Sequence, residues 1–347
     1  MAVVAALTMQ GVVFDGDGLA LGVVAVPELS EARAALVRIR ATGICGTDRA
    51  ILLGEFPAVP GVVLGHESVG EVVAVGDSAG RVRPGDQVVI NPTYYCGECS
   101  DCRSERARYC PHKDGRELGI DCPGTMAEFA MVDERFLHPL PPGMPYRRAV
   151  LIEPLACVLA NLEAAAPGWD DAVVVAGGGP IGMLVALVLA ARGYRPWLAE
   201  QDPVRVRLAA EALPEVRVLH TATLDVGRPD VVVDTTGVLL AEAVRVVAPG
   251  GTVVVMGERE AATAALGARS IATRGIRVVG AGPYPPRLFE VAVRLAETLP
   301  LERLVTHEVP LSRMTEAFAL LGVGADGNRS GDGYRAGKVL LTPDGAA

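Results

Sequence analysis

The chain has 347 residues, half of them hydrophobic, so it is long enough to bury the cores of about two ordinary domains. Its formal net charge of −9 and its pI of about 5.2 argue against a nucleic-acid partner, because phosphate binding needs a basic face. The longest apolar run, 181–191, is about half of the ~20 residues that a membrane span needs, and no basic export signal precedes it. We therefore expect no membrane association and a cytoplasmic protein.

The first 140 residues predict short strands and turns. Apolar and polar residues alternate over 35–41, which predicts a half-buried strand running toward Cys45. Residues 69–75 and 87–90 are further β-rich runs, with a turn at Pro84-Gly85-Asp86 between them. No helix of convincing length is expected before about residue 145.

The pattern then changes to alternating strands and helices. The predicted order is strand 172–176, a helix to Ala191, strand 196–199, helix 203–213, and strands 231–234 and 252–256. Strands that are apolar on both faces and alternate with helices predict a doubly wound parallel sheet.

The last segment predicts a further group of elements. These are helix 287–298, strand 305–309, helix 313–321 and a final strand 338–341. The segment 322–337 is rich in Gly, Asp and Arg, which predicts a flexible loop.

Four of the seven cysteines form a tight group with the spacing C-x2-C-x2-C-x7-C. They are Cys96, Cys99, Cys102 and Cys110. Four thiolates this close in sequence can surround one Zn2+ tetrahedrally and leave no position for substrate, so the predicted site is structural. Unpaired surface cysteines, two disulfides or an iron–sulfur cluster are the alternatives, although the spacing matches neither common ferredoxin run.

A second set of ligands is divided between two motifs. Cys45 lies in Gly-Ile-Cys-Gly-Thr-Asp at 43–48, and His66 and Glu67 lie in Gly-His-Glu at 65–67. Cysteine, histidine and glutamate together are a ligand set that Zn2+ accepts while keeping an open position. Glu153, in Glu-Pro-Leu, is placed to reach into the cleft between the domains. Taken singly, each residue could equally be a buried cysteine, a hydrogen-bonded core histidine or a solvated carboxylate.

A glycine motif follows the strand 172–176. Gly177, Gly179 and Gly182 fit G-x-G-x-x-G, with Pro180 and Ile181 opening the helix. This motif permits a tight turn, a close backbone approach to a pyrophosphate and close packing of helix on strand, so it predicts a dinucleotide site. Thr235 and Gly257 follow two later strands, whose carboxyl ends should border the nicotinamide.

Glu200, at the end of the next strand, is the residue expected to read the adenosine ribose. A carboxylate there accepts hydrogen bonds from the ribose hydroxyls and repels a 2′-phosphate, which favours NAD over NADP. Arg205 is close in sequence and could meet a 2′-phosphate, but a solvated charge on the helix face is the preferred interpretation.

Together these motifs resemble the zinc-dependent medium-chain alcohol dehydrogenase superfamily, in its polyol, threonine and glucose dehydrogenase branch. The resemblance covers nearly the whole chain in the expected order. It implies a GroES-like β-rich catalytic domain over 1–153 and 291–347 and a Rossmann dinucleotide-binding domain over 154–290. It also implies one catalytic and one structural zinc per chain, a small-molecule alcohol substrate, and a homodimer or homotetramer.

The resemblance also implies roles for individual residues. Cys45 and His66 bind the catalytic zinc with Glu67 as a further ligand, and Glu153 either binds the metal or holds its water. Thr47 hydrogen-bonds the substrate oxygen and passes its proton outward. Some relatives carry a relay histidine where this chain has Ala50, so the proton is expected to leave through water.

The implied activity is hydride transfer between a secondary alcohol and NAD. A polyol, sugar or cyclitol is expected, and threonine, an amino-cyclitol or an NADP-linked sugar oxidation are the alternatives. Loop placement suggests that Arg49, Glu55, Phe56 and Glu117 line the substrate cleft. Two rivals from other classes are a zinc-free reductase of the same fold, which the Cys45 and His66 set disfavours, and a regulatory protein without catalysis, although no motif residue is damaged.

Overall fold

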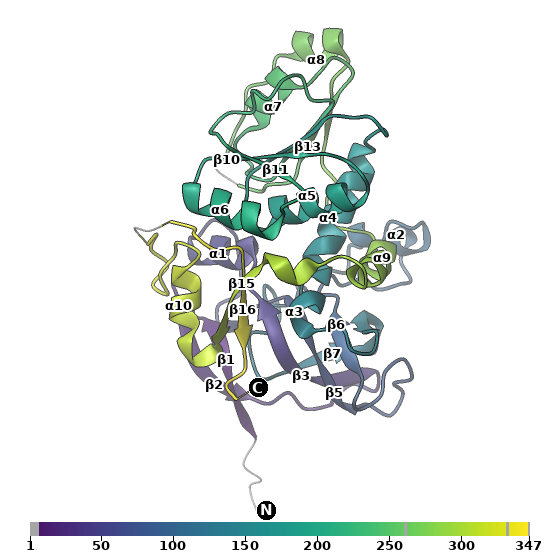
Figure 1. The fold of residues 1–347 in the computed structure, drawn as a ribbon. Helices are drawn as coiled ribbons and strands as arrows, with labels where there is room; N and C mark the ends of the chain where they lie inside the picture. Colours follow the sequence, from purple (N-terminus) through teal and green to yellow (C-terminus); the bar gives the residue numbers. More distant parts are fainter. Residues whose placement is uncertain (1–6, 260–261, 331–332, 346–347) are drawn as a thin grey trace, which may run out of the picture.

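Two sheet-based parts of the chain lie one above the other, with the helices α4 and α5 near their junction (Figure 1). This computed structural model describes residues 7–259, 262–330 and 333–345. The purple N-terminal strands and the yellow C-terminal strands share the lower part in this view, and the teal and green middle of the chain forms the upper part. The two ends of the chain therefore build one part together.

The lower part contains a seven-stranded sheet with the order β15-β16-β3-β5-β6-β8, in which β7 also pairs with β3. Its strands are β3 (Ala34–Gly43), β5 (Glu67–Val75), β6 (Gln87–Ile90), β7 (Phe129–Asp133), β8 (Leu137–Pro139), β15 (Val305–Pro310) and β16 (Lys338–Thr342). β15 and β16 pair in parallel, and β16 then pairs antiparallel with β3. The last strand of the chain is thus a neighbour of the strand that leads to Cys45.

A smaller sheet and short helices complete the lower part. The sheet has the order β2-β1-β4, with β1 (Thr8–Phe14), β2 (Leu19–Ala25) and β4 (Val62–Val63). The α-helices are α1 (Gly46–Leu52), α2 (Ser100–Arg103), α3 (Tyr146–Ala149) and α10 (Met314–Ala319). Short 3-10 turns lie at Ala107–Tyr109, Glu134–Phe136, Leu301–Leu304 and Leu311–Arg313.

The upper part is a six-stranded sheet, parallel throughout, with the order β11-β10-β9-β12-β13-β14. Its strands are β9 (Val173–Ala176), β10 (Trp197–Glu200), β11 (Arg217–His220), β12 (Val231–Asp234), β13 (Thr252–Val255) and β14 (Arg277–Val279). The helices between them are α5 (Pro180–Ala191), α6 (Pro203–Ala212), α7 (Leu240–Val246) and α8 (Ala268–Arg274). The strand order reverses beside β9, where ligands bind in open α/β sheets.

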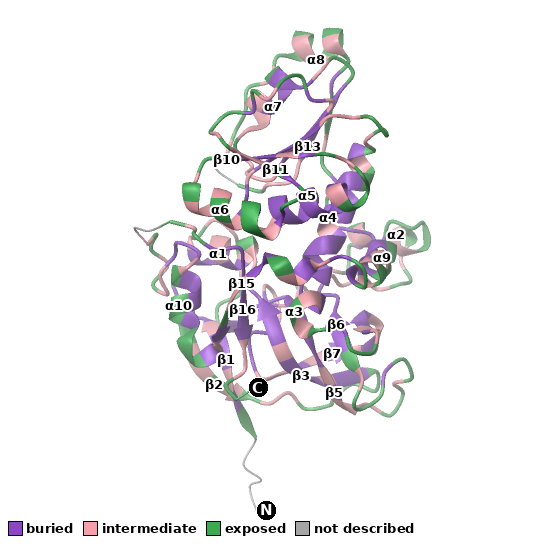
Figure 2. Cartoon of the chain, in the orientation of Figure 1, coloured by how far each residue is buried: buried purple, intermediate pink, exposed green. Residues whose placement is uncertain are grey.

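The helix α4 (Ile152–Ala165) and the helix α9 (Pro286–Ala296) belong to the core where the two parts meet. Figure 2 shows α4 and α5 buried along most of their length, while α6 and α10 carry exposed faces. One hydrophobic cluster runs from Leu151 and Leu155 of this junction to Val175 of β9 and Phe289 of α9. This continuous core fixes the two parts against each other.

The predicted order of strands and helices is confirmed for every segment named above, with bounds that differ by a few residues. The sequence patterns did not reveal the helices α1, α2, α3, α4, α7 and α8 or the strands β1, β2, β4, β7, β8, β11 and β14. α4 was missed because it is apolar on almost every face, so it has no clear helical period. α1, α7 and α8 have only seven residues each, too few for a period to show.

The segment 322–337 contains no regular helix or strand in the residues that the structure describes, apart from an isolated bridge between Val323 and Arg329. Its residues 331–332 lie outside the described part. Within the described ranges, none of the helices combines the length and the apolar character that crossing a membrane requires.

Candidate active site and metal centres

Strand register brings the two ligand motifs together. Gly43, the last residue of β3, pairs with Glu67, the first residue of β5, so Cys45 and His66 lie just beyond the same edge of the sheet. Gly65 makes the preceding turn at φ +98, and a Cβ there would lie 2.6 Å from the side chain of Met126 and 2.8 Å from its backbone nitrogen. Only glycine fits this turn, which directs His66 into the site.

The side chains of Cys45, His66 and Glu67 each offer one ligand atom, and these atoms all lie within 4.8 Å of one another. His66 and Glu67 are buried at 8% and 1% exposure, and Cys45 is half-buried. In the described part of the chain, His66 Nδ1 has no hydrogen-bond partner. Sulfur, nitrogen and oxygen donors lie close enough together to share one ion, so these residues fit a zinc site.

Acidic groups make this site electronegative. Burial acts to lower the pKa of His66, but Asp48 and Cys45 raise it well above its usual value. Asp48 is fully buried on α1; its Oδ2 accepts the Cys45 N–H at 2.8 Å, and its Oδ1 lies 3.7 Å from His66 Nδ1. A site that favours positive charge this strongly is suited to a divalent cation.

Glu153 lies in the first turn of α4, outside the group of three close ligands. It is 7% exposed, and burial followed by the charge of Glu67 raises its pKa to about 7. Cys157, one turn later, donates its thiol to Glu153 Oε1 at 3.8 Å. This placement fits a carboxylate beside the metal position better than one of its immediate ligands.

The structure adds residues that the sequence analysis did not name. Tyr284 is buried beside Glu153, and its hydroxyl donates to Asn91 Oδ1 at 3.0 Å. Lys338, the first residue of β16, forms a buried ion pair with Glu67 Oε2 and donates to the Ile44 carbonyl at 3.0 Å. Tyr284 and Lys338 lie far along the chain from the ligand motifs, so only strand order and helix packing could have revealed them.

The residues expected to contact substrate occupy several places. Thr47 Oγ1 lies 3.7 Å from Cys45 Sγ, at the start of α1. Glu117 is mostly buried and within electrostatic range of His66. Glu55 is paired with Arg329, and Phe56 lines a cavity of about 400 Å3 with Phe14 and Leu53. That cavity is not bordered by Cys45, His66 or Glu67, so a substrate role for Phe56 stays a prediction.

Arg49 is half-buried on α1, two residues after Thr47. Its Nε donates to the Leu321 carbonyl at 2.9 Å, and no carboxylate of the described residues forms an ion pair with it. Burial, followed by Arg329 and Arg259, lowers the pKa of Arg49. The side chain is therefore a partly desolvated cation that makes no ion pair within the described part of the chain, although Glu55 lies within electrostatic range of it.

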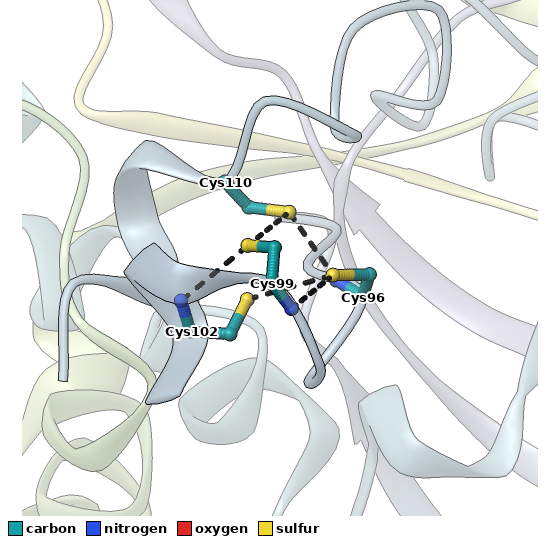
Figure 3. Close-up of side chains that lie close together, drawn as sticks. All are labelled: Cys96, Cys99, Cys102 and Cys110. Atoms are coloured by element: carbon teal, nitrogen blue, oxygen red, sulfur yellow. Dashed lines mark hydrogen bonds between the residues drawn. The ribbon is translucent and has the colours of Figure 1, made fainter. Parts of the chain in front are cut away.

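The four clustered cysteines form a second ligand group (Figure 3). Their sulfur atoms lie within 4.8 Å of one another, and the pairs Cys96–Cys102 and Cys99–Cys110 are 3.8 Å apart. A tetrahedron with Zn–S bonds of about 2.3 Å has edges of roughly 3.8 Å, so the spacing matches a closed zinc shell. No disulfide links these cysteines. The backbone N–H groups of Glu98 and Cys99 donate to Cys96 Sγ at 3.4 and 3.3 Å, and they lower the pKa of Cys96 to about 6.

The glycine turn lies between β9 and α5 as its motif predicts. Gly177 has φ +99, and a Cβ on Gly182 would lie 1.8 Å from the Gly177 carbonyl oxygen. Thr235 closes the turn from β12 by donating its hydroxyl to the Ala176 carbonyl at 2.7 Å. Gly179, Pro180 and Ile181 begin α5, whose free N–H groups are suited to phosphates, and Gly257 packs closely against Gly237 after β13.

Glu200 ends β10 and points back to this turn. Its Oε2 accepts the Gly178 N–H at 2.7 Å, and its Oε1 accepts from the backbone of Gln201 and Asp202. Arg205 donates to both carboxylate oxygens, at 2.9 and 2.8 Å, and its guanidinium lies 5.7 Å from the centre of the Tyr334 ring. The preferred interpretation of Arg205 as a solvated charge is therefore wrong, because the helix places it one turn from a buried carboxylate.

The fold and the two ligand groups define a class of zinc-binding, dinucleotide-dependent oxidoreductase, and comparisons with known proteins agree. Residues 31–142 match the alcohol dehydrogenase GroES-like domain. The chain is 35% identical to D-altritol 5-dehydrogenase of Agrobacterium fabrum, over 82% of this chain and 87% of that protein. It is 30% identical to D-arabitol-phosphate dehydrogenase of Enterococcus avium, over 90% and 94% of the two chains.

A solved structure assigned to the zinc-binding dehydrogenases, from Sinorhizobium meliloti and bound to NADP, superposes with a TM-score of 0.83. It is 28% identical, and the match covers 97% of this chain and all of that one. This chain belongs to the zinc-dependent medium-chain alcohol dehydrogenase superfamily, in its polyol dehydrogenase branch. It is an oxidoreductase of secondary alcohols that uses a nicotinamide cofactor.

Proposed function

We propose that this chain oxidises one secondary hydroxyl of a polyol or sugar-like alcohol to a ketone, with NAD as the preferred hydride acceptor. The observation that carries the proposal is the convergence of Cys45, His66 and Glu67 where β3 ends and β5 begins, with Glu153 close by. When bound, zinc supplies a Lewis acid for the alcohol oxygen, and the nicotinamide ring accepts the hydride.

The residues of the chain bind, orient and deprotonate the alcohol. Thr47 is placed to relay the hydroxyl proton, taking it on Oγ1 while giving its own proton to water, because Ala50 offers no relay group. Glu153 lies beside the metal position, and Cys157 and Tyr284 orient its carboxylate. Asp48 fixes the Cys45 loop and the His66 ring from behind.

The glycine turn and the end of β10 position the cofactor. We propose that the N-terminus of α5 holds the pyrophosphate and that Glu200 meets the adenosine ribose. The Glu200 carboxylate supports NAD over NADP, while its ion pair with Arg205 reduces the negative charge that would repel a 2′-phosphate. A relative of known structure is bound to NADP. We therefore expect a preference for NAD that is moderate in size.

The proposal extends to metal content and assembly. Two zinc ions per chain are expected, one at Cys45, His66 and Glu67, the other in the four-thiol shell. The two sheets support the proposed division into residues 1–153 with 291–347 and residues 154–290. Among the described strands, β14 has a neighbour on one side only, so its other side could pair with a second copy. A homodimer or homotetramer is the expected state.

The test is a panel of polyols and sugars assayed for NADH and NADPH formation with the purified protein. Turnover of at least one secondary alcohol that disappears when the metal is stripped and returns with added zinc supports the proposal. Turnover that survives complete metal removal contradicts it, and a reductase without zinc becomes the better assignment.

Arg49 supports a second candidate, in which the polyol carries a phosphate or a carboxylate. Named relatives include D-altritol 5-dehydrogenase, named for an uncharged polyol, and D-arabitol-phosphate dehydrogenase, named for a polyol that carries an anionic phosphate. A partly buried guanidinium that pairs with no carboxylate among the described residues, two residues from Thr47, is suited to such an anion. Matched pairs of a free polyol and its phosphate in the panel separate the candidates, and Arg49→Met should raise KM for the phosphate form alone.

A further inference from the structure

Lys338 is a buried cation at the centre of the catalytic cluster. Its side chain is 3% exposed, and the carboxylate of its partner Glu67 is 1% exposed. Burying an ammonium group costs several kcal/mol unless it is paired and hydrogen-bonded. Lys338 has both kinds of contact, because Nζ forms an ion pair with Glu67 Oε2 and donates to the Ile44 carbonyl at 3.0 Å.

These two contacts tie together the two segments that carry the metal ligands. Ile44 immediately precedes Cys45, and Glu67 immediately follows His66. Lys338 itself begins β16, whose Leu340 pairs with Gly43. A single side chain from the end of the chain therefore links both ligand-bearing ends of β3 and β5.

The backbone leaves space for this pair. A Cβ on Gly43 would lie 2.4 Å from Glu67 Oε2 and 2.6 Å from Lys338 Cε. Any larger residue at the end of β3 would displace the Glu67 carboxylate or the Lys338 side chain. The backbone at Gly43 therefore accommodates this ion pair. Three other acidic groups, Cys45, Glu153 and Asp48, lie within electrostatic range of the ammonium.

We propose that Lys338 is a positioning residue that holds Glu67 by one carboxylate oxygen and so keeps it a weak, displaceable ligand. This inference rests on the proposed function. A carboxylate that shares its charge with an ammonium donates less strongly to a metal ion, and the ammonium also repels the metal. The metal position then stays open for the alcohol, at the cost of metal affinity.

The test measures metal affinity in the full-length protein by competition with a zinc chelator, together with the visible spectrum of the cobalt-substituted protein. Lys338→Met should bind zinc at this site about ten-fold more tightly or better, a change of the size seen when groups around metal ligands are altered. The cobalt bands should shift toward a more fully coordinated ion, and kcat should fall. Lys338→Arg should restore wild-type values, because it keeps the charge.

A double-mutant cycle assigns the effect to Glu67. In a Glu67→Gln background, Lys338→Met should change zinc affinity by much less than it does in the wild type. Equal tightening in both backgrounds would overturn the proposal, because the ammonium would then act only by repelling the ion. Unchanged or weaker zinc binding by Lys338→Met would also overturn it.

Two further variants serve as controls for folding and for nonspecific charge effects. Lys338→Gln keeps a donor for the Ile44 carbonyl, so it should fold even where Lys338→Met does not, and the same tightening is expected. Arg40→Met removes the cation of the Arg40–Glu71 pair on β3 and β5, 2.7 Å between the two side chains, and should leave zinc affinity unchanged. If the wild-type protein binds no ion at Cys45, the proposed function itself fails; if it binds one and Lys338→Met does not tighten it, only this inference fails.

Discussion

The two ligand groups of this chain are built in opposite ways. The four thiols of Cys96, Cys99, Cys102 and Cys110 come from one short loop, and each needs only local turns to face the others. The site at Cys45, His66 and Glu67 needs the register of β3 and β5, and its surroundings come from α4, β16 and the segment before α9. Local assembly gives a shell of four like ligands, whereas assembly from distant elements gives three unlike ligands among buried charged side chains.

This difference explains the charge around each group. The thiol loop is stabilised mainly by backbone N–H groups aimed at its sulfur atoms. The assembled site is surrounded by buried ionisable side chains: Asp48, Glu153 and Lys338. Buried charges are costly, and groups of them in a cleft mark a functional site more often than a structural one.

The largest expected effect follows from removing a ligand of the assembled site. Cys45→Ser or His66→Ala should lower kcat by about 10³-fold or more, because Lewis-acid stabilisation is worth several kcal/mol. Zinc content should fall by one ion per chain, measured by elemental analysis, while NADH binding followed by fluorescence should persist. Near-normal turnover in either variant would show that this group is not the catalytic centre.

Removing a ligand from the local group should affect stability rather than chemistry. Cys99→Ser opens the four-thiol shell, so one zinc per chain should be lost and the unfolding temperature should drop by several degrees. The kcat of the protein that remains folded should change by less than about ten-fold, since no residue of this loop belongs to the assembled site. A loss of turnover as large as that of Cys45→Ser, in a folded protein, would break the distinction between the two groups.

The cofactor site combines both kinds of assembly, because a local glycine turn is closed by Glu200 from the next strand. Glu200→Gln removes the partner of Arg205 and leaves its guanidinium free for a 2′-phosphate. The ratio of kcat/KM for NADP to that for NAD should rise about ten- to 100-fold, the value of a charged hydrogen bond. Arg205→Met is the matched control and should not raise this ratio. An unchanged ratio in Glu200→Gln would show that residues other than Glu200 recognise the adenosine ribose.

The same distinction decides how much the sequence could predict. Short patterns could be found in the sequence. They are the thiol spacing, the glycine turn and the motifs that contain Cys45 and His66. The parallel sheet was also predicted, because its strands are apolar on both faces. Lys338, Tyr284 and the Arg205–Glu200 pair were not found, since nothing in their local sequence shows which distant residue each will meet. α4 was missed for a related reason: it is buried on nearly all sides by both parts of the molecule.

The smallest expected effect tests the junction between the two parts. The ring of His138 on β8 packs at a tilt against Phe289 of α9, with ring centres 4.7 Å apart. Burial, followed by the charge of Arg81, lowers the pKa of His138 to about 4. An unfolded histidine titrates near 6.5. The neutral ring therefore contributes stability that is complete above pH 6.5 and is lost as the pH falls toward 4.

His138→Phe keeps an aromatic ring against Phe289 but removes the titratable group. Between pH 7 and pH 5, the wild type should lose at most about 2 kcal/mol of unfolding free energy relative to this variant, because each unit of pKa shift is worth about 1.4 kcal/mol. Urea unfolding of both proteins at the two pH values measures the difference. Equal losses of unfolding free energy in the two proteins would mean that His138 is hydrated in solution. The contact between β8 and α9 would then admit water, although Phe289 is buried in the structure.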